Sequence, residues 1–95
     1  MRIGVIHVDL HIMAAQSLKG KRQVLKSLKD RLFSRFNVSV AEVGSQDMWQ
    51  RAELGIAQVS LDAKGSDSVL RKVEEFIRTH PGAVIIKLER EILTP

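Results

Sequence analysis

The sequence predicts an α+β fold in which four strands and two helices follow in the order strand–helix–strand–strand–helix–strand. Two observations lead to this prediction. Apolar residues alternate with polar ones in four segments, as in strands with one buried face, and recur at helical spacing in two others. Turn-forming residues such as Asn37, Gly44 and Pro81-Gly82 separate these segments.

The first half of the chain predicts a strand, a helix and a second strand. Met1–Met13 alternates, and its inward residues are Ile6, Val8, Leu10 and Ile12. Ala14–Gln16 is expected to be a turn, with Ser17 as the helix N-cap. Leu18–Phe36 is the expected helix, with inward residues Leu25, Leu28, Leu32 and Phe36 and with Val24 at the margin. Val38–Val43 is the second strand.

The second half predicts a strand, a helix and a last strand. In Ala52–Leu61 the apolar phase shifts after Ile56 to Val59 and Leu61, which predicts a bulge near Ala57–Gln58. A turn at Asp62–Ser66 precedes a helix over Asp67–His80, in which His80 caps or packs against the end. The helix's inward residues are Val69, Val73, Phe76 and Ile77. Ala83–Ile92 is the last strand, with inward residues Val84, Ile86, Leu88 and Ile92.

This element order favours one topology, the ferredoxin-like split βαβ sandwich, as a single domain over residues 1–95. Short connections and right-handed crossovers give a four-stranded antiparallel sheet in order 4-1-3-2, with both helices on one face. The other face would expose His7, Asp9, His11, Ile85, Lys87, Glu89 and Glu91, with Ile3, Val5, Val59 and Leu61 as further candidates. Such a partly apolar face is often covered, and a second copy of the chain is the simplest cover, so we expect a homodimer.

The composition excludes several classes of protein. Without cysteine there can be no disulfide, Cys-ligated zinc or iron–sulfur cluster, which fits a cytoplasmic location. No apolar run approaches the roughly 20 residues of a membrane span. The net charge of +4 is concentrated in Ser17–Phe36, where seven basic residues against Asp30 give +6. This asymmetry indicates an anionic partner.

The predicted first helix is therefore a candidate nucleic-acid interface. A helical wheel groups cations beside the apolar stripe and around an aromatic ring, and the candidate contacts are Lys19, Lys21, Arg22, Lys26, Lys29 and Phe33. A solvated charged face with Phe33 folded over the core edge is the simpler alternative. Cations in the first turn oppose the helix dipole, which supports a role beyond folding.

Catalytic motifs are missing or incomplete. Around Gly20-Lys21-Arg22, a phosphate-binding P-loop would need Gly at Ala15 and Ser or Thr at Arg22. Acylphosphatases share the size and topology, but their loop pattern G-x-V-Q-G-V-x-F-R is not found in "MAAQSLKGKR". There is no G-x-S-x-G motif. We assign no catalytic residue and no cofactor, and a small hydrolase-type enzyme is the last alternative.

Two further groups are candidate sites. His7, Asp9 and His11 are metal-ligand types on one strand face, yet i and i+4 lie about 13 Å apart on a strand. An ion would therefore need an adjacent pair together with Glu89 or Glu91, and we favour cross-strand pairing with Lys87, Glu89 and Glu91 instead. Trp49, with Arg51, either packs in the core or anchors a partner at the hairpin.

The stretches "SLKGKRQVLKSLKDRLFSRFNVSVAEV" and "QDMWQRAELGIAQVS" resemble the YlxP-like bacterial family, a domain of unknown function. The resemblance covers roughly Ile3 to Ile92. Gly20 departs from it, since the family usually carries a charged residue there, and His7, Asp9 and His11 lie outside the pattern. The resemblance implies a ferredoxin-like fold and, because the family's genes lie among translation genes, a role with RNA or the ribosome.

The residues and the resemblance together predict a small non-catalytic binding protein that meets RNA or a ribosomal particle through the basic helix. The alternative is a protein-binding module that uses the open sheet face or the Trp49 hairpin. A third alternative is an enzyme that uses His7, Asp9 and His11, with or without a metal ion.

Overall fold

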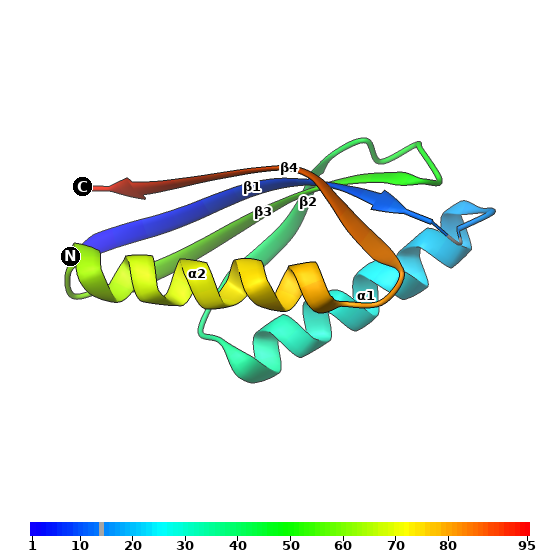
Figure 1. The fold of residues 1–95 in the computed structure, drawn as a ribbon. Helices are drawn as coiled ribbons and strands as arrows, with labels where there is room; N and C mark the ends of the chain where they lie inside the picture. Colours follow the sequence, from blue (N-terminus) through cyan, green and yellow to red (C-terminus); the bar gives the residue numbers. More distant parts are fainter. Residues whose placement is uncertain (14) are drawn as a thin grey trace.

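The computed structural model describes residues 1–13 and 15–95, and its helices and strands follow the predicted order (Figure 1). They are β1 (Arg2–Ile12), α1 (Leu18–Arg35), β2 (Ser39–Gly44), β3 (Arg51–Ser60), α2 (Ala63–Thr79) and β4 (Ala83–Leu93). The turn expected at Ala14–Gln16 includes residue 14, which lies outside the described residues.

The four strands form one antiparallel sheet in the order β2-β3-β1-β4, which is the predicted 4-1-3-2 order written from the other edge. Both helices cover the same face of this sheet, as Figure 1 shows, and the two chain ends lie together where Ile3 pairs with Leu93. The ferredoxin-like prediction is thus confirmed. The opposite face carries no helix in the described part of the chain.

The core lies between the sheet and the two helices. Alternate residues of β1 point into it, as the period of two requires, and they meet the apolar stripes of both helices. Full burial of each Leu or Ile contributes about 1.5–3 kcal/mol relative to exposure. The fully buried aliphatic residues that hold the layers together are Val8, Leu10, Ile12, Leu28, Leu32, Leu54, Val73 and Ile77.

Side-chain caps fix the starts of both helices. The Ser17 hydroxyl accepts the Gly20 N–H at 3.0 Å, which confirms the predicted N-cap of α1. The Asp62 carboxylate accepts the Gly65 N–H at 2.8 Å and starts α2 at Ala63. The sequence predicts a turn over Asp62–Ser66 and a helix that begins only at Asp67, four residues later than observed. The capping role of Asp62 explains that difference.

The bulge predicted near Ala57–Gln58 is wrong. The pairing of β3 with β1 runs without a shift from Arg2–Ser60 to His11–Arg51. Gln58 keeps the inward phase of the strand and is buried, while Val59 points outward. The Gln58 side-chain amide donates to the Val59 carbonyl at 2.8 Å, so this polar side chain has a partner in the inward position.

Bulges occur instead in the two edge strands. Between Asp9 and Leu10 the β1–β4 register shifts and leaves Ile86 without a partner, and between Glu42 and Gly44 the β2–β3 register shifts and does the same to Val43. The extra residue in β4 reverses its phase. Ile85 therefore packs against the core, whereas Val84 and Ile86 are exposed, the opposite of the prediction.

Candidate functional sites

The basic helix brings four of the five predicted cations together on one side of α1. Lys19, Arg22 and Lys26 are exposed, Lys29 is half-buried, and the Phe33 ring beside them is 50% exposed. We call these five residues the basic flank. The flank points away from α2, because the opposite side of α1 contacts that helix through Arg35, whose guanidinium lies 5.0 Å from the Phe76 ring centroid. Phe33 is thus half covered and half exposed, so a fold over the core edge, the simpler alternative, accounts for only part of its surface.

Lys21 is not part of this surface, and its prediction as a nucleic-acid contact is wrong. Only 2% of the residue is exposed, and its ammonium nitrogen lies 2.8 Å from Glu42 Oε2. The ammonium also donates to the Ser45 carbonyl at 2.7 Å and to the Gln46 carbonyl at 3.5 Å. Lys21 thus ties the start of α1 to the end of β2. The sequence contained the signal: Lys21 stands four residues before Leu25, within the apolar stripe.

Within the basic flank, Lys26 forms an ion pair with Asp30 one turn later. Its ammonium donates to Asp30 Oδ2 at 2.8 Å, and this hydrogen bond, followed by the charge of Asp30, raises the pKa of Lys26. Both side chains are exposed, so solvent screens their attraction and the pair contributes little to stability. A phosphate can replace Asp30 at little cost, so the pair leaves Lys26 available.

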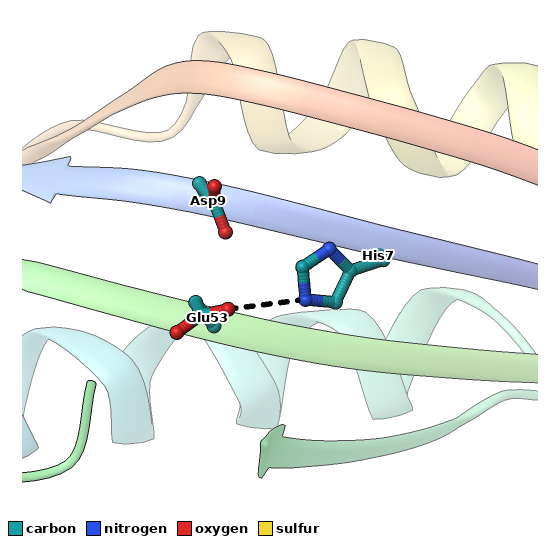
Figure 2. A group of neighbouring side chains, drawn as sticks. All are labelled: His7, Asp9 and Glu53. Carbon is teal, nitrogen blue, oxygen red and sulfur yellow. Dashed lines mark ion pairs between the residues drawn. The ribbon is translucent and has the colours of Figure 1, made fainter. Parts of the chain in front are cut away.

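The open sheet face carries a second group of functional side chains, His7, Asp9 and Glu53 (Figure 2). His7 and Asp9 follow one another on the outward side of β1, and Glu53 is the β3 partner of Asp9. The imidazole Nε2 of His7 lies 3.3 Å from Glu53 Oε1. One ligand atom from each residue lies within 4.8 Å of the other two.

This grouping corrects the predicted set His7, Asp9 and His11. His11 is not a member, because side chains at i and i+4 on a strand are too far apart, and Glu53 takes its place from the neighbouring strand. The expected pairing with β4 is also wrong for His7, since its partner is Glu53, while Lys87 pairs with Glu89 at 2.9 Å. Sequence reasoning missed Glu53 because only the β1–β3 register places it opposite Asp9.

Trp49 lies at the β2–β3 hairpin and is 54% exposed, which contradicts the core interpretation. A shallow hollow beside it is lined by His11, Asp47, Met48, Gln50, Arg51 and Ile86. The predicted pair Trp49 and Arg51 therefore shares one surface at the end of the open sheet face. None of the helices described is long and apolar enough to cross a membrane.

These features define a small ferredoxin-like sandwich with one basic flank and one sheet face free of helices. The chain belongs to the family described as "Protein of unknown function (DUF503)", whose model matches residues 3–90. It is 43% identical over 79 residues to "Uncharacterized protein YlxP" of Bacillus subtilis (strain 168), covering 83% of this chain and 86% of that relative. The family predicted from the sequence is thus confirmed.

One solved structure that it resembles is a de novo designed protein with a ferredoxin fold, determined by solution NMR. The match has a TM-score of 0.45 at 15% identity and covers 100% of this chain and 88% of the designed one.

Proposed function

We propose that the protein is a cytoplasmic, non-catalytic binding protein that contacts RNA or a ribosomal particle through the basic flank of α1. The observation that carries the proposal is the surface itself. Four accessible cations and an exposed aromatic ring follow one another along one side of a helix whose one acidic residue is Asp30. A nucleic acid complements such a surface, because its negative phosphates pair with the cations and its bases stack on the ring.

The spacing of the cations suits a nucleic-acid backbone. Arg22, Lys26 and Lys29 follow one another at intervals of four and three residues, which is about 4.5–6 Å along a helix axis. Successive cations can therefore contact successive phosphates of one strand. Phe33, one turn beyond Lys29 and two turns beyond Lys26, lies where an unstacked base can rest against it.

The test is the binding of a fluorescein-labelled single-stranded ribosomal RNA fragment at low salt, followed by anisotropy. In the variant Arg22→Glu/Lys26→Glu, two phosphate contacts become two repulsions, and we expect binding to be lost. The matched control is Lys64→Glu/Lys72→Glu, which changes the net charge equally on exposed positions of α2. The control should retain most of the affinity. An equal loss of RNA affinity in both variants would show that only the net charge matters. Unchanged affinity in the first variant would refute binding through the basic flank.

The exposed apolar side chains of the open sheet face favour a second candidate function, contact with another protein. Val43, Val59, Val84 and Ile86 are each at least 46% exposed, and Trp49 stands at one end of the group. A second copy of the chain is the partner we propose, which would make the protein a homodimer. This contact should be insensitive to salt and weakened by Trp49→Ala, as measured by sedimentation equilibrium. A monomer at all concentrations would contradict it.

A further inference from the structure

We propose that His7, Asp9 and Glu53 bind one divalent transition-metal ion on the open sheet face, with Zn²⁺ as the best match. One imidazole nitrogen and two carboxylate oxygens form a donor set that Zn²⁺ accepts, and three protein ligands leave a position for solvent. The site lies on the face of the sheet opposite α1, so the inference is independent of the proposed binding of RNA.

The geometry is close to that of a bound ion. Tetrahedral coordination at zinc distances places neighbouring ligand atoms about 3.4 Å apart. The Nε2 of His7 and Oε1 of Glu53 are already 3.3 Å apart, and all three ligand atoms lie within 4.8 Å of one another. Figure 2 shows the imidazole and the carboxylates of Asp9 and Glu53 directed into one space between β1 and β3. Small side-chain rotations complete the triangle.

The two carboxylates of the site repel each other, and a bound cation removes this repulsion. Asp9 and Glu53 stand directly opposite each other in the β1–β3 ladder, where two like charges are unfavourable. Asp9 Oδ1 is moreover buried and accepts no hydrogen bond from any of the described residues. Buried polar side-chain atoms normally have a partner, and a bound cation would provide one for Asp9 Oδ1. Lys87, the β4 partner of Asp9, is close enough to interact with the Asp9 charge, but its ammonium pairs with Glu89 Oε1 at 2.9 Å and donates no hydrogen bond to Asp9 Oδ1.

The surrounding backbone is arranged around Glu53 and Asp9. The register shift of β4 occurs next to Asp9 and that of β2 occurs next to Glu53, so both bulges flank the same rung of the sheet. Bulges are common beside functional sites, where they redirect side chains.

The residues that follow the β2 bulge hold the Glu53 carboxylate in place. Gly44 leaves room for this group, since a Cβ atom there would lie 2.6 Å from Glu53 Cδ. The Ser45 hydroxyl donates to Glu53 Oε2 at 2.8 Å and leaves Oε1 facing His7. A hydrogen bond that orients a ligating carboxylate is a regular feature of metal sites.

The experiment is isothermal titration of the chelator-treated full chain with ZnCl₂, together with Co²⁺ absorption spectra as a report on the ligand set. We expect one ion per chain. The isosteric variants Glu53→Gln and Asp9→Asn should each weaken binding at least tenfold, and His7→Ala should abolish it. The matched control is His11→Ala, which removes an imidazole from the same strand face and should leave the affinity unchanged.

Circular dichroism of each metal-free variant separates loss of binding from loss of fold. Wild-type protein that takes up no stoichiometric Zn²⁺ or Co²⁺ would overturn the proposal. So would a folded Glu53→Gln variant that binds as tightly as wild type, or an equal loss in His11→Ala.

Discussion

Replacing Lys21 by Met separates its structural role from the binding role that the sequence suggested. The substitution keeps the length and apolar stem of the side chain but removes the ammonium. Lys21 is 2% exposed, and its ammonium contacts Glu42 and the Ser45 and Gln46 carbonyls, so these three partners lose one shared donor. Lys19→Met makes the same chemical change two residues earlier, on an exposed side chain of the basic flank.

The expected magnitude follows from the burial of the pair. Removing one partner of a buried ion pair costs about 3–5 kcal/mol. The Glu42 side chain keeps 21% of its surface exposed, so water partly compensates its charge. We therefore expect Lys21→Met to lower the free energy of unfolding by about 2–3 kcal/mol, allowing for this screening. In a chain of this size that shifts the melting temperature by about 10 °C or more. Lys19→Met should cost less than about 0.5 kcal/mol.

Urea unfolding followed by circular dichroism measures both stabilities, and RNA anisotropy at 10 °C measures both affinities. The two variants should show opposite effects. Lys21→Met loses stability and keeps its RNA affinity, whereas Lys19→Met keeps stability and binds RNA more weakly. Equal stabilities of the two variants would refute a stabilising role for the buried ion pair. A loss of RNA affinity in folded Lys21→Met would show that Lys21 belongs to the binding surface.

Two further predictions concern the ends of the helices. Burial, and then the charge of Arg31, lower the pKa of His80 below its ordinary 6.5. The folded state therefore prefers neutral His80, so stability is full above pH 6.5 and declines as the pH falls below it. His80→Gln should flatten this decline below pH 6.5 in urea titrations, and an unchanged slope would contradict the assignment. Ser17→Ala removes the cap of α1 and should cost about 1 kcal/mol of unfolding free energy, whereas a cost near zero would show that the cap does not contribute.

The fold was predictable because its signals are local. The alternation of Ile6, Val8 and Leu10 and the helical spacing of Leu25, Leu28 and Leu32 need no knowledge of partners. The prediction failed in β4, where one inserted residue decides which side chains point into the core. The β4 bulge turns Ile85 inward, and a bulge depends on the register with the neighbouring strand, which composition does not encode.

In the candidate sites, too, the features set by local sequence pattern were predictable and those set by strand pairing were not. The basic flank follows from helical geometry, so Arg22, Lys26 and Phe33 lie where the wheel places them. Lys21 departs from the predicted surface because its position in the apolar stripe, and not its charge, decides where the side chain lies. Glu53 could not be assigned to a site at all, because its partners His7 and Asp9 are more than forty residues away in sequence and meet it only through strand pairing.

The central claim is that the basic flank binds RNA through phosphate contacts, and the salt dependence of the affinity tests it most directly. For single strands each contact contributes about 0.7 to the slope of log K against log salt. Lys19, Arg22, Lys26 and Lys29 therefore predict a wild-type slope of about −2.8. In Arg22→Ala/Lys26→Ala the slope should fall to about −1.4. A wild-type slope near zero, or the same slope in both proteins, would contradict the account.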